Sequence, residues 1–164
     1  MPWKFAPARP MSDNAEAMSD DLVNSTVEFL KQQKLEEQRQ AHKASTEEAT
    51  SKTRASQTWH ALREKVRNFC TESNAQLGET AFSFQVGQNT ELQVLADLPK
   101  GRQQLQAHFD AQSGNISYTA GNLSGTFRPV LEEGEFYYSD GSDMVSVEKM
   151  RLILVHGLIG RKTY

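Results

Sequence analysis

The sequence has almost no cysteine and no long apolar run. Cys70 is the only cysteine among 164 residues, which excludes an internal disulfide framework and a zinc site built from several cysteines. No apolar run approaches the roughly 18 residues that a conventional membrane-spanning helix needs. Charged residues make up 24% of the chain, close to the average, so the sequence is not that of a highly charged disordered tail. The length suits one ordinary domain with some chain left over.

The sequence also lacks the motifs of common enzyme classes. It contains no nucleophile elbow, no phosphate-binding loop and no dinucleotide-binding glycine pattern. Cys70 follows Phe69 at the end of an apolar stripe, where packing as a small apolar residue is more common than catalysis. None of the histidines has the spacing of a metal-binding pair; they are His42, His60, His108 and His156. We therefore predict no catalytic residue, no metal and no cofactor, and no motif identifies a family.

Charge is divided unevenly along the chain, although the net charge is only −3. Residues 1–30 have a net charge of −3, residues 31–70 of +4, residues 71–147 of −7 and residues 148–164 of +3. A segment at −7 repels phosphate, and glutamates interrupt the basic segment as on a solvated helix face. We expect no nucleic-acid partner. The five acidic residues between 132 and 143 do not fit a calcium-binding loop either.

The first residues resemble an unstructured lead. Three of the first ten are proline, which removes backbone donors and restricts φ. No apolar core follows the early basic residues, as it would in a secretory signal. We expect residues 1–18 to be disordered, the location to be cytoplasmic, and no membrane association.

Residues 19–73 contain neither proline nor glycine, which favours helix. Ser19 is suited to cap its start, with acidic residues in the first turn. Two apolar stripes at helical spacing follow. The first consists of Leu22, Val23, Val27 and Leu30, and the second of Trp59, Leu62, Val66 and Phe69.

Between these stripes, residues 36–57 offer only alanine as an apolar side chain. We expect either one long helix or two helices divided near residues 43–46, where Ser45 and Glu48 have the spacing of a capping box. Residues 19–55 are then either a coiled-coil or partner-binding arm, or a linker. The lack of leucine, isoleucine and valine at heptad positions weakens the coiled-coil interpretation.

After Gly78 the apolar period changes from 3.6 to 2, which predicts strands. Six short runs follow at intervals of about ten residues, with turn residues between them, and this spacing is typical of an antiparallel meander. Polar residues at the alternate positions indicate one solvated face. In the fifth run, residues 124–131, Pro129 argues for an edge position or an early stop.

The last segment predicts a helix that packs on the meander. Ser142 and Asp143 are suited to cap it, and Gly160 is suited to end it. Its apolar stripe consists of Val147, Met150, Ile153, Leu154 and Leu158. We predict an α+β fold: an antiparallel β-meander of about five to six strands packed against a preceding and a following helix. Residues 56–164 form this two-layer domain, and a long polar helical extension precedes it.

These features favour a non-enzymatic protein-interaction or accessory module. The partner, another protein or a second copy of the chain, binds the stripe of Leu22, Val27 and Leu30 or adds a strand at a sheet edge. The alternative is a small ligand-binding or enzymatic domain with an aromatic-lined pocket between sheet and helices. Its lining residues are Phe82, Phe109, Tyr118, Phe136, Tyr137 and Tyr138.

Overall fold

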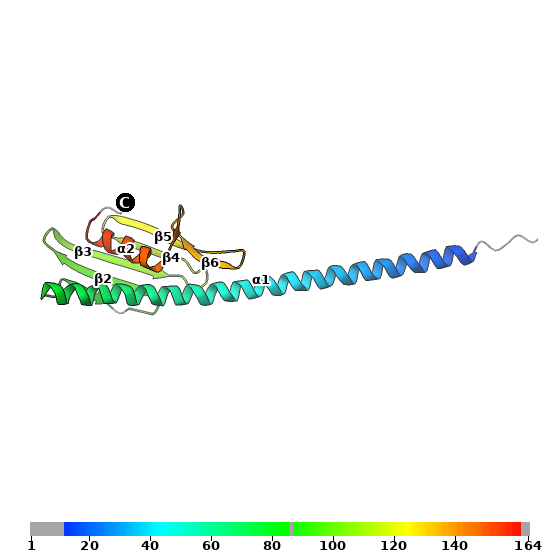
Figure 1. Cartoon of the computed structure of the whole chain (residues 1–164), viewed down its shortest axis with the longest axis horizontal. Coiled ribbons are helices and arrows are strands. Elements are labelled where there is room, and N and C mark those ends of the chain that lie inside the picture. Colours follow the sequence, from blue (N-terminus) through cyan, green and yellow to red (C-terminus); the bar gives the residue numbers. More distant parts are fainter. Residues whose placement is uncertain (1–11, 86, 162–164) are drawn as a thin grey trace, which may run out of the picture. The chain divides into compact units, whose positions relative to one another are not determined.

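The computed structural model describes residues 12–85 and 87–161. The elements follow in the order α1, β1 to β7 and α2 (Figure 1). The chain divides into two compact units between Ser45 and Thr46. We call residues 12–45 the helical unit and residues 46–161 the sheet unit.

A single helix, α1, covers Ser12–Leu77. The helix therefore continues past Ser45, and the expected cap at Ser19 is wrong because this serine lies inside α1. Residues 12–18 of the expected disordered lead belong to the helix, and residues 1–11 lie outside the described residues. No proline or glycine interrupts the sequence between Pro10 and Gly78, so no residue in between breaks the helix.

Glycine ends both helices, as the sequence predicts. Gly78 follows α1 with a φ of 71°, and its amide donates to the carbonyl of Asn74 at 2.9 Å. Gly160 follows α2 (Val147–Leu158) with the same φ of 71°. Glycine adopts this left-handed conformation without the strain that a side chain would add.

The strands form an antiparallel meander in which each strand pairs with the next in sequence. Their bounds are β1 Phe82–Gln85, β2 Glu91–Leu98, β3 Gly101–Phe109, β4 Ile116–Ala120, β5 Leu123–Glu132, β6 Glu135–Ser139 and β7 Met144–Val145. The predicted α+β meander is confirmed, with seven strands instead of five to six. The additional strand, β7, has two residues and is too short to show an alternating pattern.

Strand β5 pairs with a different neighbour in each half. Leu123–Phe127 pairs with β4, and Arg128–Glu132 pairs with β6. Pro129 lies in the second half, where β5 has no ladder with β4. The absence of an amide donor in proline therefore removes no hydrogen bond to β4. Proline therefore marks an edge, as expected, and β5 does not stop early.

The cap of α2 differs from the prediction. Ser146 caps the helix, because its hydroxyl accepts a hydrogen bond from the amide three residues on at 3.1 Å. Capping by Ser142 and Asp143 is wrong. The carboxylate of Asp140 accepts from the amides of both residues at 2.9 Å and holds them in a turn before β7.

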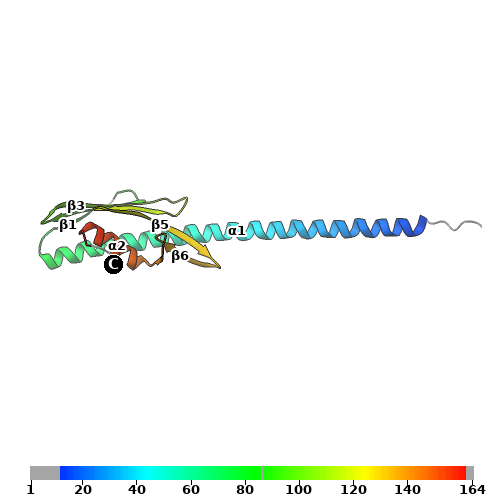
Figure 2. The same cartoon turned by 90° about the horizontal axis from the view of Figure 1, so that it is seen from above.

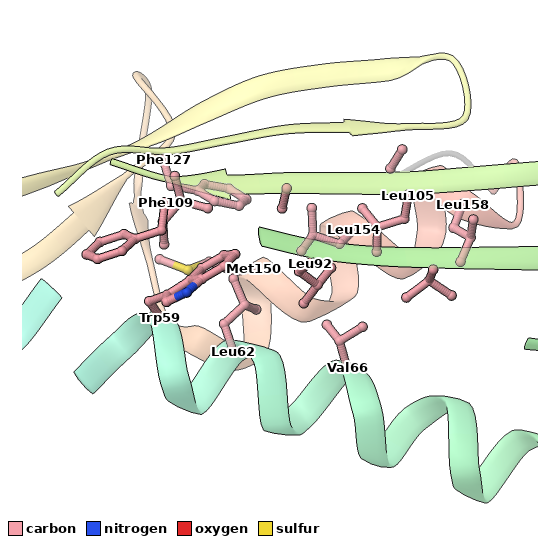
Figure 3. Packing of buried hydrophobic residues seen from close by; sticks show 14 of the residues in the cluster. Trp59, Leu62, Val66, Leu92, Leu105, Phe109, Phe127, Met150, Leu154 and Leu158 are labelled. Carbon is pink, nitrogen blue, oxygen red and sulfur yellow. The ribbon is translucent and has the colours of Figure 1, made fainter. Parts of the chain in front are cut away.

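Within the sheet unit, α2 and the second half of α1 lie on the same side of the strands (Figure 2). Trp59, Leu62 and Val66 of α1 are at most 1% exposed and point toward the sheet (Figure 3). Phe69 is only partly buried, and Ala55 and Cys70 extend the buried stripe instead. The sheet and α2 contribute the rest of this core, including Leu92, Val94, Leu105, Phe109, Ile116, Phe127, Met150, Leu154 and Leu158.

Polar side chains fix α1 to the strands at two levels. The amide group of Asn74 donates to the carbonyl of Phe82 at 2.7 Å and accepts from the amide of the same residue at 2.9 Å. The indole of Trp59 donates to the carbonyl of Asn89 at 2.6 Å, and its ring stacks on Phe109 at 5.7 Å between centroids. These bonds hold the buried stripe in register with the sheet.

Candidate functional site

The helical unit carries an apolar surface that is open to solvent. The predicted partner-binding residues Leu22, Val27 and Leu30 are 69%, 42% and 51% exposed. Every described residue from position 16 to position 50 is exposed. Seven of the ten large apolar side chains that are exposed in the described residues lie in this unit: Met18, Leu22, Val23, Val27, Phe29, Leu30 and Leu35.

Six of these side chains form two rows along α1. Val23, Val27 and Leu30 follow one another at spacings of four and three residues, so they share one row. Met18, Leu22 and Phe29 form a second row at spacings of four and seven residues. We call the two rows together the apolar helix face. Met18 and Phe29 were not among the predicted binding residues, although their helical spacing from Leu22 was the signal for both.

Acidic and amide side chains occupy the opposite side of the same helix. Asp21 and Glu28 are two turns apart, and Glu28 pairs with Lys31 at 3.3 Å. The hydroxyl of Thr26 donates to the carbonyl of Leu22 at 2.7 Å and so needs no outside partner. The helix is therefore amphipathic, with its apolar side turned to solvent.

The solvated face of the sheet brings an acid, a base and a hydroxyl into one row. Glu91, His108 and Ser117 are register partners on β2, β3 and β4 and lie in a hollow of about 340 Å³. The hydroxyl of Ser117 donates to the backbone carbonyl of His108 at 3.5 Å. Because this hydroxyl bonds to the backbone and not to the imidazole, the row does not assemble a nucleophile with its base.

A second hollow, of about 410 Å³, lies in the sheet unit beside β6, β7 and the start of α2. Phe136, Tyr137 and Tyr138 line it together with Met144 and Val147. The hydroxyl of Tyr138 donates to the carbonyl of Gly114 at 2.7 Å, and burial raises the pKa of this phenol. The hydroxyl of Tyr138 therefore already has a hydrogen-bond partner within the protein.

The six aromatic residues of the alternative hypothesis do not line one common pocket. Phe82, Phe109 and Tyr138 belong to the buried core, and Tyr118 stacks on the buried Phe127 at 4.7 Å. Only three of the six lie at the second hollow. Most of this aromatic surface therefore packs the core.

The surroundings of the candidate nucleophile and of the candidate metal ligands indicate structural roles for these residues. Cys70 is 3% exposed, and burial raises the pKa of its thiol to about 11, so the nucleophilic thiolate is scarce near neutral pH. Among the described residues, no three histidine, cysteine, aspartate or glutamate side chains are placed to hold a metal ion. Backbone amides of the following turn lower the pKa of Asp140.

Several stretches of strand in the described part of the chain have a ladder on one side only, among them β1 and part of β6. Strand β1 pairs with β2 on one side only. In β6, Tyr138 and Ser139 pair with β7, whereas residues 135–137 have a ladder only with β5. Short edges of this kind can accept an added strand.

The described residues include no helix that is long and apolar enough to cross a membrane. Comparison with protein-family models, with curated proteins and with solved structures finds no match to this chain.

Proposed function

We propose that this protein is a non-enzymatic interaction module that recruits a protein partner through the apolar helix face. The observation that carries the proposal is the exposure of Leu22, Val27 and Leu30, at 69%, 42% and 51%, on one amphipathic helix. Exposed apolar patches of this kind typically mark interaction sites, because covering them removes apolar surface from water.

The remaining chemistry of the described residues supports an interaction role over catalysis. The Cys70 thiol is buried, and the hydroxyl in the Glu91–His108–Ser117 row bonds to the backbone. An amphipathic helix that lays its apolar face into a groove or against other helices is a common recognition mode. The anchors are then spaced as Val23, Val27 and Leu30 are.

The test places a photo-crosslinking amino acid at Val27 of the full chain, expressed in the cells that normally produce it. The matched control carries the same amino acid at Glu28, whose neighbours three and four residues away belong to neither apolar row. We expect a covalent protein adduct from position 27 and none from position 28. Adducts from neither position, or equally from both, contradict the proposal.

A second candidate is ligand binding in the hollow beside β6 and β7. It is favoured by Phe136, Tyr137 and Met144, which present apolar surface in a concave site of about 410 Å³. A thermal-shift screen with aromatic metabolites tests it, because a ligand stabilises the state that it binds. We expect a hit to raise the melting temperature of the wild type and not that of Phe136→Ala. A screen without a reproducible rise removes this candidate.

A further inference from the structure

The helical unit divides its charge as well as its apolar surface. Residues 12–30 contain five acidic residues and no basic one, whereas residues 31–45 contain four basic and two acidic residues. One end of the exposed helix is therefore acidic and the other is basic. A second helix of the same sequence has the same two ends.

This division decides between the two ways in which copies of the helix can pair. In a parallel pair the acidic ends lie side by side, and like charges along a seam destabilise it. In an antiparallel pair each acidic end lies beside a basic end, so the net interaction between the two ends becomes attractive. Charge at the flanks of a helix seam is the feature that sets partner orientation in coiled coils.

The apolar row sets the register of the antiparallel pair. Val23, Val27 and Leu30 are centred between residues 26 and 27. Antiparallel pairing about this centre sets Val23 of one copy beside Leu30 of the other and brings the two copies of Val27 together. The rows of the two copies thus cover each other, and no apolar side chain of either row lies opposite a charge.

The same register aligns the charges that border this row. Asp20 precedes Val23 by three residues and Val27 by seven, and Lys34 follows Val27 by seven, so both lie along the row. With the centre between residues 26 and 27, Asp20 of one copy lies opposite position 33 of the other, between Lys31 and Lys34. Glu16 lies one turn further out, opposite Glu37, so the favourable charge pairs are those of Asp20 with the two lysines. One centre therefore aligns the apolar contacts with the Asp20 pairs.

We infer that the partner of the apolar helix face is a second copy of this chain, bound antiparallel through Val23, Val27 and Leu30. The inference rests on the proposed function and names its partner. The row of Met18, Leu22 and Phe29 lies beside this seam, so two such pairs can close into a four-helix bundle. The assembly contains an even number of chains, because the antiparallel pair is its unit.

The first measurement is the solution mass of the full chain by light scattering after gel filtration. We expect the mass of two or four chains for the wild type and of one chain for Val23→Ser/Val27→Ser. The control Glu28→Gln changes a residue whose neighbours belong to neither apolar row and should keep the wild-type mass. A wild-type mass of one chain, or of an odd number, overturns the inference.

The second measurement determines orientation by disulfide formation. Full-length Asp20→Cys, Lys34→Cys and the double variant are oxidised in parallel, with the wild type showing the background from buried Cys70. We expect covalent dimers from the double variant and few from either single variant, since Asp20 lies near Lys34 of the other copy but far from the other Asp20. Equal cross-linking of the single variants means parallel pairing and overturns the inference.

The two proposals fail in different ways. A monomeric wild type whose Val27 cross-links to another protein refutes self-association and leaves the interaction function standing. A monomeric wild type without any adduct from Val27 refutes both.

Discussion

At the scale of single residues, Gly157 marks the closest approach of α2 to the sheet. A Cβ at this position would lie 2.8 Å from the Cβ of Ala120 and 2.9 Å from its carbonyl oxygen. Both atoms belong to the packed end of β4, so neither can move without shifting the strand. The absence of a side chain here sets how deeply α2 packs.

We predict that Gly157→Ala lowers the free energy of unfolding by up to about 2 kcal/mol, because overpacking at about 1–3 kcal/mol outweighs a gain in helix propensity of about 1 kcal/mol. Urea denaturation measures the change. Gly87→Ala is the control, since a Cβ there meets chiefly the flexible carboxylate of Glu91 at 3.1 Å. An unchanged or raised stability of Gly157→Ala would contradict the packing described.

Cys70 shows how burial changes the chemistry of one residue. Its pKa is raised from 9.0 to about 11, chiefly because burial penalises the charged thiolate. We predict that the native protein reacts slowly with an aromatic disulfide reagent at pH 8, and rapidly once unfolded in guanidinium chloride. Fast reaction in the native state would place the thiol at the surface.

The same shift links stability to alkaline pH. Because the folded pKa lies above the unfolded value, the contribution of the neutral thiol is complete below pH 9 and declines as pH rises toward 11. We expect the unfolding free energy of the wild type to fall more steeply between pH 9 and pH 11 than that of Cys70→Ala. Parallel curves for the two proteins would show that the thiol does not contribute.

At the scale of secondary-structure elements, the start of α2 shows that the local sequence alone does not determine where a helix begins. Ser142 and Ser146 are both suited to cap a helix, and only the hydroxyl of Ser146 accepts an amide of the first turn. Asp140 uses the earlier amides for a turn, and β7 pairs with β6 between them. Pairing of β7 with β6 thus decided which serine is the cap.

Ser146→Ala should lower the free energy of unfolding by about 1 kcal/mol, because one amide at the helix start loses its acceptor. Ser142→Ala, in the exposed turn, should change it by less than about 0.5 kcal/mol. Thermal unfolding of both variants gives the comparison. The reverse order of effects would move the helix start four residues toward the N-terminus.

The turn between β5 and β6 contains the only non-glycine residue with positive φ among the described residues, Glu133 at 51°. Gly134 follows at 81°, and Glu132 pairs with Glu135 across this two-residue turn. Asparagine adopts such a conformation more readily than glutamate. We predict that Glu133→Asn raises the unfolding free energy by up to about 1 kcal/mol, measured in urea. Glu133→Gln, which removes the charge alone, should give a smaller gain.

At the scale of the whole molecule, the core belongs to one unit. All its buried residues lie between Ala55 and Leu158, and the helical unit contributes none. We predict that residues 46–164 produced alone unfold cooperatively on heating, within a few degrees of the full chain. Circular dichroism measures both transitions. A gradual, non-cooperative loss of signal would mean that the helical unit is needed for the fold.

Much of the architecture follows from the sequence alone. Three features depend on neighbouring residues, where backbone geometry acts directly. They are the alternation in β1 to β6, the helical spacing of Trp59, Leu62 and Val66, and the two terminating glycines. Leu22, Val27 and Leu30 were recognisable for the same reason. Met18 and Phe29 were missed because a polar residue interrupts their row at position 25.

Other features were decided only by the folded structure, because they depend on contacts that periodicity does not encode. Strand β7 exists through its ladder with the neighbouring β6, and Ser146 caps α2 because that ladder sets where the helix begins. Phe82, Phe109 and Tyr138 enter the core because two helices cover the same face of the sheet. Periodicity therefore determined which elements form and which faces are apolar, whereas packing determined which of those faces are buried and which, as on the apolar helix face, stay exposed to solvent.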